Sequence, residues 1–269
     1  MLNNLKNKVA IITGGAGALG GTMALGLAKQ GAKVVIIGRT AHTVQSKVNE
    51  INNAGGIAIG IIADVLNREQ LDTAKKEVIQ KWKRIDILVN AAGGNMKGAT
   101  IMPEDSFFDM NMDDFDAVTK LNLKGTVLPT IVFGKQMAKQ GQGNIVNISS
   151  MAAQQALTRV VGYSTSKASI DIFTKWLAVE MAQKHSEKIR VNAIAPGFFI
   201  GEQNRDLLLN KDGSLTARGK TIVTNTPMKR FGKADELLST LYWICDDNSS
   251  FITGIVVPVD GGFSAFSGV

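Results

Sequence analysis

The stretch KVAIITGGAGALG at residues 8–20 decides the fold of this chain. Its first half is a short apolar run, which is typical of a strand covered on both faces. A glycine turn follows and leads into a segment rich in Ala, Leu and Met, which predicts a helix. Glycines let a pyrophosphate approach the backbone, while unpaired amides and the helix dipole face its charge. The stretch therefore predicts a dinucleotide site whose turn contacts the ligand through Gly14, Gly17, Leu19 and Gly20.

The same kind of strand recurs along the chain, at residues 33–37, 57–62, 86–90, 144–148, 189–194 and 255–259. These strands alternate with helical patterns, which predicts an α/β fold: a doubly wound parallel sheet of the Rossmann type. The chain has 269 residues, enough for one such domain and short for two. We expect a single catalytic domain over residues 1–269. Residues 198–230 lack regular periodicity, and a segment this long and irregular predicts a substrate lid within the domain.

Composition excludes several classes of protein. The net charge is +7, but the basic residues are scattered without an aromatic-interleaved patch, which argues against nucleic-acid binding. No apolar run approaches the length needed to cross a bilayer, and the first residues lack the core of a secretory signal. The one cysteine, Cys245, fits a reducing compartment, and His42 and His185 indicate no metal site. These features favour a cytoplasmic protein that acts on a small-molecule substrate.

Acid–base chemistry is indicated by a second stretch. Residues 163–167 read YSTSK in a predicted helix, so Tyr163 and Lys167 share one helical face. A nearby ammonium favours the phenolate and brings the pKa of a tyrosine toward the working range. Ser150 follows a predicted strand, where its hydroxyl could meet the same atom. Together the three side chains suit proton transfer to a carbonyl or from an alcohol. Asn122, a polar amide among apolar neighbours, needs a specific partner.

The nucleotide preference depends on the end of the second strand. An NAD site usually has a carboxylate there for the ribose 2′-hydroxyl, whereas a basic residue accommodates a 2′-phosphate. This chain has Gly38 and Arg39, so we expect NADP(H) to be favoured over NAD(H). The alternative is that Arg39 stacks on the adenine or faces water. The ends of the next two strands are also expected to meet the cofactor, through Asp64, Val65, Asn90, Ala91 and Gly93.

These features follow one another in the expected order, and the chain resembles the short-chain dehydrogenase/reductases over essentially its whole length. The resemblance rests on the glycine turn, residues 90–93, Asn122, Ser150, Tyr163, Lys167, Pro196, Gly197 and residues 260–262. It implies that Tyr163 is the general acid and base, that Lys167 lowers its pKa and holds the nicotinamide ribose, and that Ser150 binds the substrate oxygen. It also implies that Asn122 anchors a water chain for protons, that Pro196 and Gly197 adjoin the cofactor, and that no metal is required.

A narrower resemblance lies in the lid and the C-terminal tail. Residues 93–95, 196–205, 218–222 and 260–269 are similar to those of one group within this family, the D-mannonate oxidoreductases, also called fructuronate reductases. The similarity implies D-fructuronate and D-mannonate as the ketone and the alcohol. Arginine is the best residue to hold the substrate carboxylate, through paired hydrogen bonds. We expect Arg205 first and Arg159 second in this role. Asn95 and Gln154 are expected to form hydrogen bonds with hydroxyl groups of the substrate. The alternative for Arg205 is a surface ion pair with Asp206 or Glu202.

Other activities stay open. A related sugar-acid or polyol dehydrogenase, such as a gluconate 5-dehydrogenase, would use the same core chemistry. So would a 3-oxoacyl-carrier-protein reductase, although the sequence shows no obvious basic docking patch for an acyl carrier. A different class is a cofactor-sensing regulator that lost the chemistry. Such a protein would have little reason to keep Asn122, Ser150, Tyr163 and Lys167 together.

The helix that begins near Tyr163 is apolar on two sides. One stripe, which could pack on the sheet, consists of Ile170, Phe173, Leu177 and Met181. Another, on roughly the opposite side, consists of Ile172, Trp176 and Val179. A helix apolar on two faces is usually buried on both. We therefore expect a homo-oligomer, a homotetramer as in much of the family, and the alternative is a loop of the same chain over the second stripe.

Overall fold

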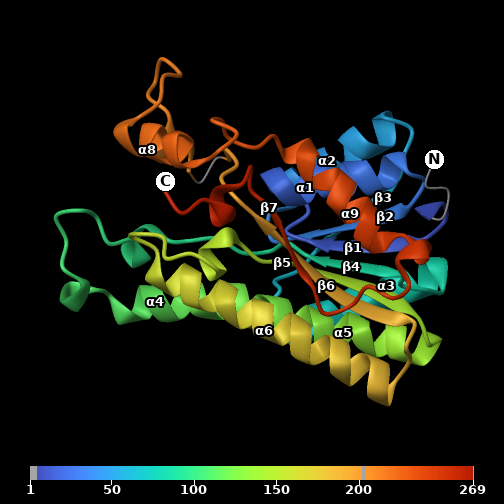
Figure 1. Cartoon of the computed structure of the whole chain (residues 1–269). Helices are drawn as coiled ribbons and strands as arrows, with labels where there is room; N and C mark the ends of the chain where they lie inside the picture. The colour runs from blue at the N-terminus through green and yellow to red at the C-terminus, as the bar shows by residue number, and fades with distance from the viewer. Residues whose placement is uncertain (1–4, 202–203, 269) are drawn as a thin grey trace.

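The structure is a computed structural model that describes residues 5–201 and 204–268. Within these residues the strands form one parallel sheet in the order β3-β2-β1-β4-β5-β6-β7 (Figure 1). The strands are β1 Val9–Thr13, β2 Lys33–Gly38, β3 Ile57–Ile62, β4 Ile87–Asn90, β5 Gly143–Ile148, β6 Ile189–Pro196 and β7 Val256–Val259. The predicted doubly wound parallel sheet is confirmed.

Helices cover both faces of this sheet. The α-helices are α1 Ala18–Lys29, α2 Ala41–Asn53, α3 Arg68–Trp82, α4 Met112–Thr119, α5 Gly125–Gln140, α6 Val161–Lys184, α7 Arg205–Leu208, α8 Ala217–Asn225 and α9 Leu238–Cys245. Figure 1 shows α1, α2 and α9 on one face, α5 and α6 on the other, and α8 over one end of the sheet. Among the described residues, no helix combines the length and apolar character needed to span a bilayer.

The strands build two cores because successive side chains point to opposite faces. In β1, Ala10 and Ile12 pack with residues of α1, α2 and α9, whereas Val9 and Ile11 pack with residues of α3, α5 and α6. All four side chains are buried. A central strand with helices on both sides has no polar face. This is why β1 reads as a continuous apolar run rather than as an alternating one.

The strand order opens a crevice at the carboxyl ends of β1 and β4. The chain moves outward from β1 to β3 and then returns to β4 on the other side of β1. Thr13, the last residue of β1, pairs with Asn90, the last residue of β4. Ligands of open parallel sheets bind where the strand order reverses. The glycine turn and the segment after Asn90 meet at this point.

Two segments differ from the prediction. The sequence pattern over residues 113–139 predicts one helix, but in the structure a π-helical segment, Lys120–Lys124, which contains Asn122, separates α4 from α5. Such a wider turn is frequent at functional sites. The segment 198–230 is not irregular throughout, because it contains α7 and α8. Thr216 caps α8 by accepting a hydrogen bond from the Gly219 N–H at 3.1 Å, a local signal that hydrophobic periodicity does not register.

Candidate active site

The glycine turn between β1 and α1 forms a cradle, a space against the backbone that side chains on these residues would fill. Gly14 has a φ of +62°, and a Cβ there would lie 2.8 Å from the Ala92 Cα. A Cβ on Gly20 would lie 2.4 Å from the Gly14 carbonyl oxygen. The N-cap of α1 is Gly17, which has no side chain to cover the first turn of the helix. The turn therefore fits a pyrophosphate, which needs close approach to the backbone and a helix N-terminus.

Asn122 ties the π-helical segment to the residues that follow β4. Its Nδ2 donates to the carbonyl oxygens of Gly94 and Val118 at 2.7 and 2.8 Å, and its Oδ1 accepts from the Gly94 N–H at 3.1 Å. A Cβ on Gly93 would lie 2.6 Å from Asn122 Oδ1 and 3.5 Å from Lys167 Nζ. Gly93 therefore lies between Asn122 and Lys167. The structure brings together these three residues, which the sequence places far apart.

Ser150, Tyr163 and Lys167 meet at the end of β5. Lys167 Nζ lies 5.5 Å from the centre of the Tyr163 ring, on the shared face of α6 that the four-residue spacing predicts. The Ser150 hydroxyl forms a hydrogen bond with the Tyr163 phenol and accepts from the Ala152 N–H at 3.1 Å. Lys167 Nζ donates to the Ile148 carbonyl oxygen at 2.6 Å. The arrangement can hold a carbonyl oxygen between a serine and a tyrosine hydroxyl beside a buried amine.

The electrostatics differ from the expectation. Burial raises the pKa of Tyr163, and the hydrogen bond with Ser150 opposes this by a smaller amount. Burial also lowers the pKa of Lys167 from 10.5 to about 8, while the charge of Asp171 acts in the opposite direction. Desolvation penalises the charged form of each group. The expected lowering of the Tyr163 pKa by Lys167 is not found, because burial is the largest cause of the shift and raises the pKa.

The end of β2 has little space for an acidic side chain. A Cβ on Gly38 would lie 2.9 Å from Val44 Cγ2. Arg39 is exposed, and the described residues offer its side chain no hydrogen-bond or ionic partner. Val65, beyond β3, is buried. A guanidinium free of protein partners remains available to a ligand phosphate or to water.

Asp64 and Asn90 have side chains engaged within the protein. One carboxylate oxygen of Asp64 accepts from the Leu66 N–H at 2.8 Å, which shapes the turn after β3. Asn90 is buried, and its Nδ2 donates to Thr130 Oγ1 and Asn147 Oδ1, both at 2.9 Å. Its Oδ1 is buried as well and has no hydrogen-bond partner among the described residues.

The segment predicted to be a substrate lid, residues 198–230, begins beside the glycine turn. Pro196 ends β6, and a Cβ on Gly197 would lie 2.6 Å from the Asp260 Cα, so the chain here runs against the C-terminal tail. A Cβ on Gly201 would lie 3.7 Å from the Ala18 Cβ at the start of α1. The segment after β6 therefore passes close to the N-terminus of α1. Pro196 and Gly197 lead directly into this segment.

Residues 8–211 match the family described as short chain dehydrogenase. The chain belongs to the short-chain dehydrogenase/reductase family. An uncharacterized oxidoreductase of Bacillus subtilis (strain 168), named UxuB, is 48% identical over 99% of this chain and 98% of its own length.

Solved structures show the same fold over the full length. A protein from Haemophilus influenza, described as a proposed D-mannonate oxidoreductase with bound NAD, is 41% identical. Its TM-score is 0.92, and the match covers 100% of this chain and 99% of that one. A gluconate 5-dehydrogenase from Burkholderia cenocepacia J2315, in complex with NADP and tartrate, is 28% identical with a TM-score of 0.85, covering 98% of each protein. The chain is therefore an NAD(P)-dependent oxidoreductase that acts on CH–OH and C=O groups.

The substrate residues expected for this short-chain dehydrogenase do not gather at one point. Asn95 Nδ2 donates to Thr100 Oγ1 at 2.8 Å, and its Oδ1 is buried without a hydrogen-bond partner. A buried acceptor without a partner is unusual in a folded protein. Arg205 is exposed on α7 and makes no ion pair with Asp206, while Glu202 lies outside the described residues. Arg159 is partly buried in the loop before α6.

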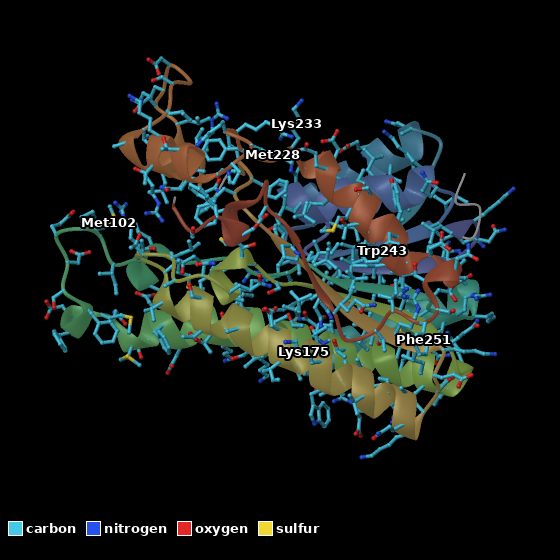
Figure 2. The ribbon with its side chains drawn as sticks, in the orientation of Figure 1. Met102, Lys175, Met228, Lys233, Trp243 and Phe251 are labelled. Atoms are coloured by element: carbon cyan, nitrogen blue, oxygen red, sulfur yellow. The ribbon has the colours of Figure 1, made fainter. Side chains whose placement is uncertain are left out.

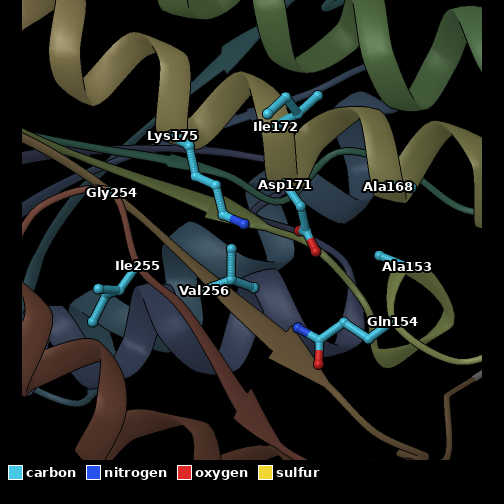
Figure 3. A pocket seen from close by; sticks show the side chains of 9 residues that line it. All are labelled: Ala153, Gln154, Ala168, Asp171, Ile172, Lys175, Gly254, Ile255 and Val256. Atoms are coloured by element: carbon cyan, nitrogen blue, oxygen red, sulfur yellow. The ribbon is translucent and has the colours of Figure 1, made fainter.

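Gln154 belongs to a different hollow, of about 580 Å³, between α6 and β7. Figure 3 shows Gln154 in this hollow with Asp171 and Lys175 of α6. Gln154 forms a hydrogen bond with Asp171, whose carboxylate also accepts from the Ser149 hydroxyl. Tyr163 does not line the hollow. The side chain of Gln154 is thus engaged with Asp171, and its role as a partner of substrate hydroxyl groups stays a prediction.

Two residues of the site were not predicted. The Thr13 hydroxyl accepts from the Ala91 and Ala92 N–H groups at 3.2 and 3.3 Å, which joins the ends of β1 and β4. Its position directly before the glycine turn was the available signal. Arg218 of α8 donates to Thr158, 60 residues earlier in the chain. No local sequence pattern indicates that contact. Among the described residues, no group of His, Cys, Asp or Glu side chains could hold a metal ion.

Proposed function

We propose that this enzyme interconverts D-fructuronate and D-mannonate, with NADP(H) favoured as the cofactor. The substrate pair is supported by the 41% identity, over the whole chain, to the Haemophilus protein described as a proposed D-mannonate oxidoreductase. The chemistry is supported by the meeting of Ser150, Tyr163 and Lys167 beside the glycine cradle.

Tyr163 is the proton donor in the direction of reduction. Its phenol donates to the substrate carbonyl oxygen, and the Ser150 hydroxyl holds the same oxygen in place. Burial favours the neutral phenol, so the proton is in place before reduction begins. The phenolate that remains is stabilised by the Lys167 ammonium, 5.5 Å from the ring centre. The nicotinamide, when bound, supplies the hydride for reduction and accepts it in oxidation.

Lys167 and Asn122 serve the return of the proton. Lys167, with a pKa of about 8, exchanges its proton readily near neutral pH and can restore the phenol. Both amide hydrogens of Asn122 are taken by Gly94 and Val118. A water chain held by Asn122 would therefore rest on acceptor atoms, the side-chain Oδ1 or the backbone carbonyl, rather than on the amide N–H groups.

The preference for NADP(H) rests on the end of β2. Gly38 provides no carboxylate to repel a 2′-phosphate, and the crowded position against Val44 opposes one. Arg39 has no partner among the described residues and can pair with that phosphate. The Haemophilus structure contains NAD, so the cofactor has to be tested with both nucleotides.

The substrate is tested by hydride transfer, followed by absorbance with NADPH and with NADH. D-fructose is the matched control, because it differs from D-fructuronate by the carboxylate. We expect kcat/KM for D-fructuronate to exceed that for D-fructose by about ten- to a hundredfold, the value of a buried charge-assisted hydrogen bond. Faster turnover of 5-keto-D-gluconate or of an acyl-carrier ketone would favour the alternative reductases. Cofactor binding without turnover of any ketone would favour the regulator.

The assembly is proposed to be a homotetramer. The first stripe of α6 packs inward, since Ile170 and Leu177 are buried. The second stripe is exposed, with Ile172, Trp176 and Val179 at 64%, 59% and 56%, so no described loop covers it. Trp243 and Phe251 are exposed as well (Figure 2). Light scattering at micromolar concentration tests the proposal, and a monomeric mass would refute it.

A further inference from the structure

Arg218 connects the lid to the loop that precedes the catalytic helix. It is partly buried on α8, and its Nη1 and Nη2 approach Thr158 Oγ1 and the Thr158 carbonyl oxygen at 3.3 and 3.5 Å. Figure 1 shows α8 above the end of the molecule at which α6 begins. Arg218 therefore reaches from the lid to a point only five residues before Tyr163 in the chain.

A second arginine is held beside it. Arg159 follows Thr158 directly and has a φ of +79°, a backbone conformation that costs energy for a residue with a Cβ. Its carbonyl oxygen accepts from the Ile101 N–H at 3.0 Å, which fixes the loop to the segment that carries Asn95. Burial lowers the pKa of Arg218, and the charge of Arg159 lowers it further. Arg159 is therefore close enough for its charge to act on the Arg218 guanidinium.

Neither charge is neutralised by the described part of the chain. The ion pairs within residues 5–201 and 204–268 involve other arginines and lysines. Arg218 also lies in the first turn of α8, which has no acidic residue and where the helix dipole disfavours a cation. Arg218 thus carries a positive charge in the first turn of α8, and Arg159 carries another on a strained backbone. An anion bound by both residues would stabilise this arrangement.

We propose that Arg159 and Arg218 bind the carboxylate of the sugar acid, in place of Arg205. The inference rests on the proposed function and deepens it by naming the residues that select an acid over a neutral sugar. Two planar guanidinium groups offer paired donors to two carboxylate oxygens. Arg159 precedes α6 by two residues, so a carboxylate held here leaves the far end of the sugar to reach Tyr163. Asn95, whose Oδ1 is buried without a partner, belongs to the segment that Ile101 fastens to Arg159.

The test measures kcat/KM for D-fructuronate and D-fructose in Arg159→Gln, Arg218→Gln and Arg205→Gln. Lys220→Gln is the matched control, because Lys220 is an exposed cation on the same helix. We expect Arg159→Gln and Arg218→Gln each to lower kcat/KM for D-fructuronate by about ten- to a hundredfold and to change that for D-fructose by less than about threefold. Arg218→Lys should recover part of the loss, because it restores the charge without the planar fork.

The outcomes separate this inference from the proposed function. A wild-type enzyme that does not prefer D-fructuronate to D-fructose overturns the proposed function, and the arginine pair with it. A wild type that prefers D-fructuronate, with the preference kept in Arg159→Gln and Arg218→Gln but lost in Arg205→Gln, overturns the pair alone. Equal losses for both sugars, with a lower Tm, would show that Arg218 merely fastens α8 to the loop, and would also overturn it.

Discussion

This enzyme has a cofactor end, formed by the glycine turn and Gly93, and a proposed substrate end, formed by Arg159 and Arg218. The two ends are built from different kinds of contact. A Cβ on Gly14, Gly20 or Gly93 would lie within 2.8 Å of backbone atoms or of the buried Asn122 amide. Arg159 and Arg218, at the proposed substrate end, are only partly buried, and Arg205 is exposed. The first region tolerates almost no added atom, whereas the second holds long side chains on loops and short helices.

This difference separates what each region can do. A close-packed backbone cradle fits a constant ligand, such as the pyrophosphate of a dinucleotide, and a change there disturbs the fold as well as binding. Side chains on loops over a rigid scaffold can change without loss of the fold, and they commonly determine specificity. Tyr163 belongs to α6, where its ring centre lies 5.5 Å from Lys167 Nζ. Substitutions in the three places should therefore have separable effects.

The largest effect is expected for Tyr163→Phe. The substitution removes the phenolic proton donor but keeps the ring, so the fold and the cofactor site should remain. General acid–base groups contribute about 10²–10⁴-fold, and we expect kcat to fall by at least about a hundredfold with both cofactors. Steady-state kinetics measures the loss, and NADPH titration checks binding. A variant that retains more than about a tenth of wild-type kcat contradicts the role of Tyr163.

Gly20→Ala should destabilise the close-packed glycine turn at the cofactor end. Alanine in a helix usually gains about 1 kcal/mol over glycine, but here its Cβ would lie 2.4 Å from the Gly14 carbonyl oxygen. Overpacking of this kind costs about 1–3 kcal/mol, so we expect a net loss of unfolding free energy together with weaker NADPH binding. Urea denaturation and cofactor titration measure the two losses.

Gly17→Ala is the control for this substitution. Gly17 has a φ of −77°, and a Cβ there would lie 3.3 Å from the same carbonyl oxygen, a contact that a small shift relieves. The free energy of unfolding of this variant should change by less than about 0.5 kcal/mol. Equal stability of the Gly20 and Gly17 variants would show that the turn is not close-packed.

The difference between local contacts and contacts distant in sequence also explains which features the sequence predicts. The glycine turn, β1 and the Tyr163–Lys167 spacing are local patterns, and each forms as expected because its geometry depends on neighbours in the chain. The contact of Arg218 with Thr158 requires α8 to fold back across 60 residues. The raised pKa of Tyr163 reflects burial, which depends on tertiary packing, whereas the four-residue spacing to Lys167 indicated only a lowering. The π-helical turn at Asn122 forms where its amide bonds to Gly94, a partner distant in sequence.

A smaller effect is expected from the titration of Lys167, which should make the free energy of unfolding depend on pH. The pKa of Lys167 is about 8 in the folded chain against an ordinary 10.5, so between these values the unfolded chain binds more protons. Stability due to this residue therefore rises with pH from about 8 to about 10.5. Between pH 7 and pH 9.5 the wild type should gain about 1–3 kcal/mol relative to Lys167→Met. Urea denaturation of both proteins at the two pH values measures the gain, and a constant difference would contradict the burial of a titrating amine.

The smallest effect is expected from Arg39→Ala, which probes an exposed edge of the cofactor end. Arg39 lacks a protein partner among the described residues, so its removal should leave the free energy of unfolding nearly unchanged. A lost charge-assisted bond to a 2′-phosphate should weaken NADPH binding by about tenfold and NADH binding by much less. Titration of each nucleotide by fluorescence measures both dissociation constants, with Arg68→Ala as an exposed control on α3. Equal losses for NADPH and NADH would show that Arg39 stacks on the adenine, which both nucleotides share. No loss for either would mean that the guanidinium faces water, and the preference for NADP(H) would then have to come from Gly38 alone.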